Sequence, residues 1–290
     1  MKTALIDIGS NTIRLVIYDG KKEIKNTAVY AGLISDVYEG EISQEGIFKI
    51  VSALRSMKKT ANEYSCDEIY AFATASLRDI FDKDGLCDFI YQATGIKIDI
   101  ISEQKEAYYD YMGLRSIYDD ENCVAFDLGG GSCQIIVCEK NSPREVKSFK
   151  IGSQRLCDCF VSGVLPNEDE CGAIRRCVRR AVSDMVLLKG IGCSRIFAMG
   201  GAVFALTNLK RECLQSDGEY LTKDDLEKIT HLSREKIEAI VPKRLKTVIP
   251  AAYTMLEILE YTGAERIIAT PVGVRDGILE EKLSEKAKNA

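Results

Sequence analysis

Two segments of the chain each place an aspartate just before a turn of glycine and small polar residues. The first runs from Ile6 to Thr12 (IDIGSNT) and the second from Phe126 to Ser132 (FDLGGGS). Glycine lets the main chain approach a ligand closely, and the N–H groups of such a turn form a concavity that binds phosphate. An aspartate beside it would repel phosphate unless it held a cation such as Mg²⁺. These residue types therefore predict phosphate and magnesium chemistry.

The spacing of the two turns indicates a duplicated domain. Asp127 follows Asp7 by 120 residues (127 − 7), which is too long for a solenoid repeat. The chain has 290 residues, 46% of them hydrophobic, enough for two domains with separate cores. We expect domain I at residues 1–121 and domain II at residues 122–290. The two turns would then face each other as a clamp for a phosphate chain and a metal ion.

Charge and composition argue against several classes of protein. The net charge is −5 and the pI is about 5.3, whereas nucleic-acid binding calls for a basic face. No apolar run of 18 residues and no export leader are found, so we expect a cytoplasmic protein that does not bind membranes. Eleven cysteines in that setting indicate reduced thiols. The single histidine, His231, excludes histidine-based triads and multi-histidine metal sites.

Hydrophobic periodicity predicts the same order of elements in each half. In the first half, Ser43 can cap a helix, and Gly95 can end one. The strands expected there are 3–8, 13–18, 23–29, 68–73 and 96–101, and the later helices are 84–94 and 106–118. The second half is expected to contain strands 123–128, 133–139, 145–151, 195–199 and 266–269, and helices 167–188, 251–262, one from Ala202 and one from Val274. A helical insertion at about 212–248 carries Thr222 and Asp225 at the spacing of a capping box.

Three antiparallel strands followed by alternating helices and strands form the order of a ribonuclease-H-like domain. The fold class we expect is therefore α/β, with two tandem ribonuclease-H-like domains that resemble the actin, Hsp70 and sugar-kinase superfamily (the actin-like ATPase fold). Within it, the chain resembles the exopolyphosphatase and guanosine pentaphosphate phosphohydrolase (Ppx/GppA) family in its short two-domain form. The segments that carry this resemblance are 7–19 (DIGSNTIRLVIYD), 73–79 (ATASLRD), 101–114 (ISEQKEAYYDYMGL), 126–137 (FDLGGGSCQIIV), 198–206 (AMGGAVFAL) and 249–279.

This resemblance implies roles for particular side chains. Glu106 falls on the family's water-activating glutamate and would be the general base, whereas taken alone it would be an exposed carboxylate at a helix start. Asp127, and more loosely Asp7, would hold Mg²⁺. Arg78, which alone would suggest a surface ion pair, would grip phosphate. The other expected contacts to phosphate are Ser10, Asn11, Arg14, Gly129, Gly130, Gly131, Ser132, Gly200, Gly201 and Arg275.

The implied activity is Mg²⁺-dependent hydrolysis of a terminal phosphoanhydride by base-activated water. Polyphosphate, or guanosine penta- or tetraphosphate, would be the partner, and a homodimer is compatible with the sequence. Two alternatives remain open: a kinase or ATPase of the same superfamily, and a regulator that binds (p)ppGpp or polyphosphate without turnover. The last helix could pack on either domain. The arginines between 175 and 180 could form either a solvated helix face or a surface that steers a polyanion.

Overall fold

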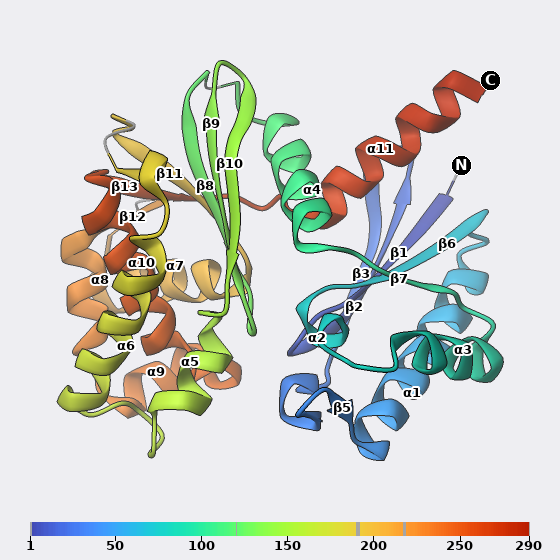
Figure 1. Ribbon diagram of the computed structural model, residues 1–290, viewed down its shortest axis with the longest axis horizontal. Helices are drawn as coiled ribbons and strands as arrows, with labels where there is room; N and C mark the ends of the chain where they lie inside the picture. Colours follow the sequence, from blue (N-terminus) through green and yellow to red (C-terminus); the bar gives the residue numbers. More distant parts are fainter. Residues whose placement is uncertain (1, 120, 190–191, 217–218, 290) are drawn as a thin grey trace. The chain divides into compact units, whose positions relative to one another are not determined.

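The structure is a computed structural model that describes residues 2–119, 121–189, 192–216 and 219–289. Its contacts divide the chain into two compact units (Figure 1). Unit 1 comprises Met1–Glu106 and Ile278–Ala290, and unit 2 comprises Ala107–Gly277. Each unit is described by itself.

Unit 1 is built on a five-stranded sheet in the order β3-β2-β1-β6-β7. The strands are β1 (Lys2–Ile8), β2 (Thr12–Asp19), β3 (Lys22–Tyr30), β6 (Glu68–Ala73) and β7 (Ile98–Ile100). The first three are antiparallel, whereas β6 is parallel to both β1 and β7. The carboxyl ends of β1 and β6 therefore meet at one edge of the sheet, where the first candidate turn begins.

Two helices cover one face of the unit 1 sheet. They are α1 (Gln44–Glu63) and α3 (Lys83–Thr94), which share an apolar core with alternate residues of the strands (Figure 1). Ser43 caps α1 by accepting from the Gly46 N–H at 3.0 Å, and Gly95 ends α3 in the left-handed conformation at φ 66°. Both predicted helix ends are confirmed.

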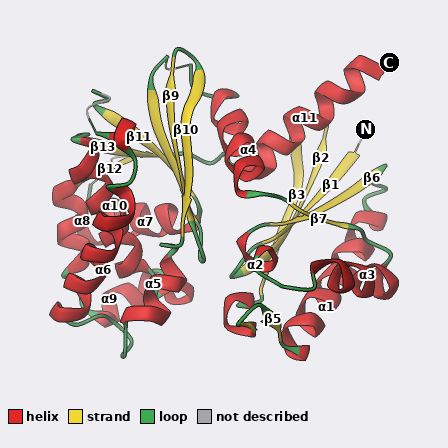
Figure 2. Ribbon diagram, viewed as in Figure 1, coloured by secondary structure: helices red, strands yellow, loops and turns green. Residues whose placement is uncertain are grey.

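Unit 2 repeats this plan around a six-stranded sheet in the order β10-β9-β8-β11-β13-β12 (Figure 2). Its strands are β8 (Cys123–Leu128), β9 (Cys133–Glu139), β10 (Ser142–Phe149), β11 (Arg195–Met199), β12 (Tyr220–Thr222) and β13 (Arg266–Ala269). The helices on one face are α5 (Ser153–Phe160), α6 (Glu168–Val182), α7 (Gly201–Leu214) and α10 (Val248–Thr262). Both sheets have the expected order of antiparallel and then parallel strands, which confirms the α/β fold class.

The insertion in unit 2 follows α7. It contains β12, α8 (Lys223–Thr230), α9 (Arg234–Ile240) and a short 3₁₀ helix, η3 (Pro242–Arg244). The capping box of Thr222 and Asp225 is present, with the Asp225 N–H donating to the threonine hydroxyl at 3.2 Å. The edge strand β12 was not predicted, because its three residues are too few to show a period.

The division into units falls inside two helices rather than at residue 121. The first turn of α4 (Glu103–Arg115) binds unit 1, whereas Ala107 and Leu114 pack against the sheet of unit 2. The last helix, α11 (Val274–Asn289), leaves unit 2 at Gly277 and then contacts unit 1. There Lys282 lies 4.8 Å from the centre of the Tyr70 ring.

Several short elements differ from the prediction. The expected helix 167–188 ends at Val182 and is followed by a single 3₁₀ turn, η2 (Val186–Leu188). The sequence did not predict five further features: the 3₁₀ turn η1 (Leu33–Asp36), the small hairpin of β4 (Val37–Tyr38) and β5 (Glu41–Ile42), and the helices α2 (Ala75–Arg78), α5 and α9. No helix in the described parts of the chain is both long and apolar enough to cross a membrane.

Candidate active site

The first candidate turn joins β1 to β2 through the two residues Ser10 and Asn11. The N–H of Gly9 donates to the carbonyl of Thr12 at 3.1 Å, which closes the turn. The carbonyls of the two turn residues accept hydrogen bonds from the chain that follows β3. Ser10 accepts from the N–H of Ile34, and Asn11 accepts from the amides at positions 31 and 32.

This arrangement leaves the amides of the first loop available to a ligand. Because the carbonyls of Ser10 and Asn11 are engaged, the loop is held in place, and among the described residues its two N–H groups donate to no backbone carbonyl. The side-chain oxygen of Asn11 is also buried with no hydrogen-bond partner in the described part of the chain. Unused donors of this kind suit an anion, and an unused buried polar atom suits a ligand.

The second turn joins β8 to β9 in the same way. Here the N–H of Gly129 donates to the carbonyl of Ser132 at 3.0 Å, around the two residues Gly130 and Gly131. The amides of Gly130, Gly131 and Ser132 donate to no backbone carbonyl in the described residues. Each position of this turn lies 120 residues after its counterpart in the first (for example 129 − 9), so the repeat in sequence is a repeat in hydrogen bonding.

Helix α5 holds the carbonyl side of the second turn. The N–H of Ser153 donates to the carbonyl of Gly129, and the amides of residues 154 and 155 donate to that of Gly130, each at 3.0 Å. A side chain on Gly152 would collide with the backbone of Gly130 and Gly131. Gly152 is therefore a residue of the site that sequence reasoning missed, because the short helix that it precedes was not predicted either.

Asp127 lies at the junction of β8 and β11. It is opposite Gln134 in the hairpin, as Asp7 is opposite Arg14 in the first. Gly200, at φ 99°, packs so closely that a Cβ atom there would lie 2.8 Å from Oδ1 of Asp127 and 2.6 Å from the Leu128 carbonyl. Only glycine allows this backbone conformation and this approach together. The structure thus brings the predicted residues Asp127, Gly200 and Gly201 together.

Arg244 is a second residue that sequence reasoning missed. Its guanidinium group, carried by η3, lies where a side chain on Gly201 would be. Gly201 begins α7, and the amino end of a helix attracts anions through its unused N–H groups and dipole. An arginine at that place adds a full positive charge and a planar set of donors. It is remote in sequence from both turns, so only the fold reveals it.

The predicted base, Glu106, is buried and bonded to Arg78. Glu106 is 5% exposed, and its carboxylate accepts a hydrogen bond from the Nη2 atom of Arg78. Arg78 also donates from Nε to the Ile101 carbonyl at 3.2 Å, and its Nη1 lies 3.5 Å from the Glu103 carboxylate. The reading of Glu106 as an exposed helix-start carboxylate is therefore wrong, whereas the reading of Arg78 as an ion-pair residue agrees with these contacts.

Local structure explains why these two side chains meet. Arg78 ends the short helix α2, which follows β6, and Ser76 in that helix anchors it by donating to the Ile8 carbonyl at 2.8 Å. Glu106 lies in the first turn of α4, which follows β7, and Ser102 caps this helix by accepting from the Lys105 N–H. Since β6 and β7 are parallel neighbours, the segments after them lie side by side.

Two predicted contacts remain outside these clusters. Arg14 donates to Oδ1 of Asn26 at 2.6 Å, and Asn26 is opposite Val16, farther along the strand from the turn. Arg275 is the second residue of α11 and is half-buried. In the described residues no group of three or more acidic, histidine or cysteine side chains is placed to hold a metal ion.

The thiol of Cys133, the residue that follows the second turn, is unreactive. Burial raises the pKa of Cys133 well above its usual range, and the carboxylates of Asp127 and Asp110 raise it further. Because the thiolate is the nucleophilic form, this cysteine is not a candidate nucleophile.

Two of the four arginines on α6 belong to an internal ion network. Arg175 and Arg179 donate from Nε to the two oxygens of Glu257, at 2.5 and 2.8 Å, and both also contact Glu260. Arg176 and Arg180 are exposed. The two alternatives for this run therefore apply to different residues: Arg175 and Arg179 are engaged by Glu257 and Glu260, and Arg176 and Arg180 are the pair that the steering alternative concerns.

Comparison with known proteins places the chain in a family. The sequence pattern described as "Ppx/GppA phosphatase family" matches residues 21–286. The chain is 29% identical to the bifunctional 3-dehydroquinate synthase/phosphatase of Fusobacterium nucleatum, over 92% of this chain and 44% of that protein. It therefore spans less than half the length of that relative.

Other relatives are similar over most of the chain. Exopolyphosphatase 1 of Mycobacterium leprae is 21% identical, with 99% of this chain and 91% of that protein covered. Guanosine-5'-triphosphate,3'-diphosphate pyrophosphatase of Aeromonas hydrophila is 23% identical over 95% of this chain and 58% of its own length. The crystal structure of an exopolyphosphatase from Cytophaga hutchinsonii has the same fold, with a TM-score of 0.86, 21% identity and 98% of both chains covered.

Proposed function

Because the chain belongs to the Ppx/GppA phosphatase family, we propose that it releases terminal phosphate from inorganic polyphosphate, guanosine pentaphosphate, or both. In this proposal the chain is a hydrolase of phosphoanhydrides, like the exopolyphosphatase and the guanosine-5'-triphosphate,3'-diphosphate pyrophosphatase to which it is similar. The observation that carries the finer proposal is the buried carboxylate of Glu106, which is held by Arg78 at the end of two parallel strands. A carboxylate fixed in this way suits a general base.

The residues of the chain supply two functions in the proposed reaction. In unit 1 the amides of the first turn, and in unit 2 the amides of the second turn with Arg244 beside Gly201, are the groups suited to bind phosphate oxygens. Glu106 accepts a proton from water. The water oxygen forms a bond to the terminal phosphorus while the bond from phosphorus to the bridging oxygen breaks. The electron pair of that bond leaves with the shortened chain as its new terminal phosphate oxygen.

Magnesium is part of this proposal. Asp7 and Asp127 are each the last residue but one of the strand that leads into a candidate turn, and carboxylate oxygens are ligands that Mg²⁺ prefers. This ion usually binds one or two carboxylates and completes its coordination with water and substrate phosphates, so a cluster of three acidic residues is not required. The residues present therefore fit Mg²⁺, which when bound would neutralise charge on the phosphate oxygens.

Phosphate release from polyphosphate and from guanosine pentaphosphate tests the proposal. We expect the wild type to hydrolyse at least one of them, with activity lost on chelation and restored by Mg²⁺. Glu106→Gln should lower kcat about 10²- to 10⁴-fold, the contribution of a positioned base. Glu63→Gln, which changes an exposed carboxylate at the end of α1, is the matched control.

Two results would contradict this assignment. Full activity of Glu106→Gln would remove the mechanism. Transfer of phosphate from ATP to an acceptor without polyphosphate hydrolysis would favour a kinase or ATPase, whereas tight binding of either anion without turnover would favour a regulator.

A further inference from the structure

Two neighbouring strands of unit 2 each begin with an arginine. Arg195 begins β11 and Arg266 begins β13, and the two residues are register partners on these parallel strands. Register partners on adjacent strands lie about 4.8 Å apart, and their side chains project from the same face of the sheet. Two positive charges are therefore held side by side at the amino ends of these strands, in a protein whose net charge is −5.

Arg266 has no counter-charge in the described part of the chain. Its other neighbour across the sheet is Thr222, which is uncharged. The guanidinium of Arg266 forms no ion pair among the described residues, and its Nε atom is buried with no acceptor there. A buried N–H without a hydrogen bond is unfavourable, and so is a partly buried charge without a partner. Both features favour the binding of an anion.

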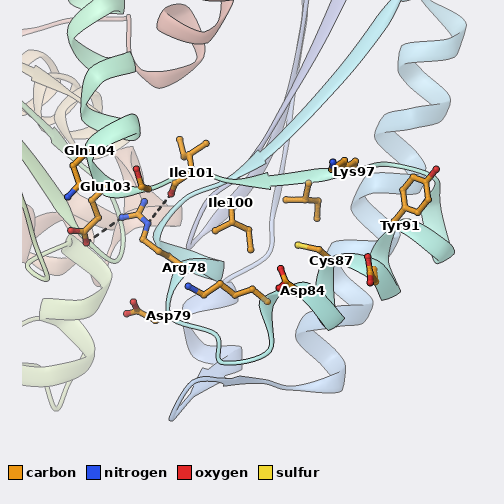
Figure 3. A pocket seen from close by; sticks show the side chains of 14 residues that line it. Arg78, Asp79, Asp84, Cys87, Tyr91, Lys97, Ile100, Ile101, Glu103 and Gln104 are labelled. Atoms are coloured by element: carbon orange, nitrogen blue, oxygen red, sulfur yellow. Dashed lines mark hydrogen bonds and ion pairs between the residues drawn. The ribbon is translucent and has the colours of Figure 1, made fainter.

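Another half-buried arginine shows how the same group is satisfied elsewhere. Arg78 lies at one end of a cavity in unit 1, and Figure 3 shows its guanidinium paired with Glu103 and bonded to the Ile101 carbonyl. The Nε atom of Arg78 therefore has an acceptor, and its charge has carboxylate partners. Arg266 has neither among the described residues, and an oxyanion supplies both.

Aromatic rings hold the two guanidinium groups of unit 2. The guanidinium carbon of Arg195 lies 5.6 Å from the centre of the Phe197 ring, and that of Arg266 lies 5.6 Å from the centre of the Tyr220 ring. Such contacts restrict a cationic side chain without using its N–H groups. Because Tyr220 is 37% exposed and Arg266 is only half-buried, this pair can be reached from solvent.

We propose that Arg266 and Arg195 together bind a phosphate group at the amino ends of β11 and β13. A planar guanidinium presents parallel N–H groups that match the oxygens of phosphate. A phosphomonoester carries a charge of about −1.5 to −2 at pH 7, so two adjacent arginines suit it better than they suit a singly charged carboxylate. The group is either free phosphate or the phosphoryl group of a nucleotide, for whose base Tyr220 offers a ring.

This site is distinct from the candidate active site. Gly200 and Gly201 follow the carboxyl end of β11, whereas Arg195 is at its amino end. At about 3.3 Å per residue, Arg195 and Gly200 are about 16 Å apart along the strand. The inference therefore goes beyond the proposed function, and it holds whether or not the chain hydrolyses phosphoanhydrides.

A single tryptophan can report on this site alone. The chain contains no tryptophan, so Tyr220→Trp places the only one beside Arg266. Tryptophan also preserves the contact between ring and cation. We expect the fluorescence of this variant to change saturably as inorganic phosphate is added at constant ionic strength. Phosphate bound at the candidate active site would be too far away to contact the reporter.

Substitutions in this tryptophan background test the arginine. Arg266→Gln should raise the dissociation constant for phosphate about 10- to 100-fold, the effect expected from losing hydrogen bonds between charged groups. Arg266→Lys keeps the charge without the paired donors and should give a smaller rise, so it carries the test if the glutamine variant does not fold. The control is Arg144→Gln, which removes an exposed arginine of unit 2 that pairs with Glu139, and it should bind phosphate as the parent does.

The choice of ligand identifies the source of the phosphate group. Equal binding of inorganic phosphate and adenosine monophosphate would assign the site to free phosphate, whereas tighter binding of the nucleotide would assign it to a nucleotide. The inference would be overturned if phosphate produced no saturable change, or if neither substitution of Arg266 altered the dissociation constant. Binding of adenosine or acetate as tightly as phosphate would also overturn it, because neither carries the charge of a phosphate group.

Discussion

Arg78 is bonded to the carboxylate that the sequence assigns as the catalytic base. Its guanidinium donates to Glu106, and the two side chains are only 13% and 7% exposed. The sequence predicted that Arg78 grips phosphate, and in this structure its donors are directed to Glu106, Glu103 and the Ile101 carbonyl. The arginine therefore fixes the position of the proposed base.

This pairing predicts strong coupling between the two residues. Arg78→Met would leave the buried Glu106 carboxylate without its cation, and we expect a loss of about 3 kcal/mol in the free energy of unfolding. Glu106→Gln alone should cost less, because a neutral amide tolerates burial better than a charge. In a double-mutant cycle by denaturant unfolding, the coupling should be about 1–3 kcal/mol. Strictly additive losses would mean that the ion pair contributes nothing.

Gly152→Ala should damage the second turn while sparing the fold. The new methyl group would occupy the place of the Gly130 and Gly131 backbone, so the turn must move and its amides must be displaced. We expect a KM for polyphosphate raised about 10-fold and a stability loss of about 1–3 kcal/mol. Gly163→Ala is the control, since its nearest neighbour is the Leu165 carbonyl at 3.5 Å. Equal kinetics for the two variants would contradict this role.

The sequence predicted those parts of the fold that depend on local pattern. Strands β6, β8, β9, β11 and β13 have the predicted bounds, because each is a compact apolar segment between turn residues. The capping box of Thr222 and Asp225 was recognised for a similar reason, since its spacing is fixed within one helical turn.

The remaining site residues depend on contacts between distant segments. Nothing near Arg244 in the sequence connects it with Gly201, and the bond between Arg78 and Glu106 requires the parallel pairing of β6 and β7. Helix α5 was missed because its eight residues give too short a period to identify. The repeat identified the turns, whereas the side chains that surround them come from tertiary structure.

The arginines of α6 should differ in their effect on stability. Glu257 is 2% exposed and takes two charged hydrogen bonds, so Arg175→Gln should lower the free energy of unfolding by about 1–3 kcal/mol. Arg176→Gln, one residue away on the exposed face, should change it by less than about 0.5 kcal/mol. Denaturant unfolding of both variants measures the difference. Equal effects would show that the network with Glu257 does not contribute to stability.

A nearly buried ion pair in the insertion of unit 2 should make stability depend on pH. Lys210 lies 2.9 Å from Asp225, and their side chains are 3% and 13% exposed. Burial alone would raise the pKa of Asp225, but hydrogen bonds from Lys210 and Thr222 outweigh it and hold this pKa below its usual range. The pair therefore stabilises the fold above the unfolded-state pKa of about 3.9, and this contribution is lost as pH falls through the lowered folded-state pKa.

Lys210→Met should weaken that dependence. Without the lysine, only the hydrogen bonds of Thr222 oppose the effect of burial, so the pKa of Asp225 rises toward its unfolded value and stability changes less with pH. We expect the variant to be about 3 kcal/mol less stable than the wild type at pH 7, with the gap narrowing below about pH 4. Urea unfolding from pH 7 to pH 3 measures it. Lys228→Met, which breaks an exposed pair with Asp224, is the control and should lower the free energy of unfolding only slightly at every pH. If the loss of stability in Lys210→Met stayed constant with pH, Asp225 would not be the group responsible.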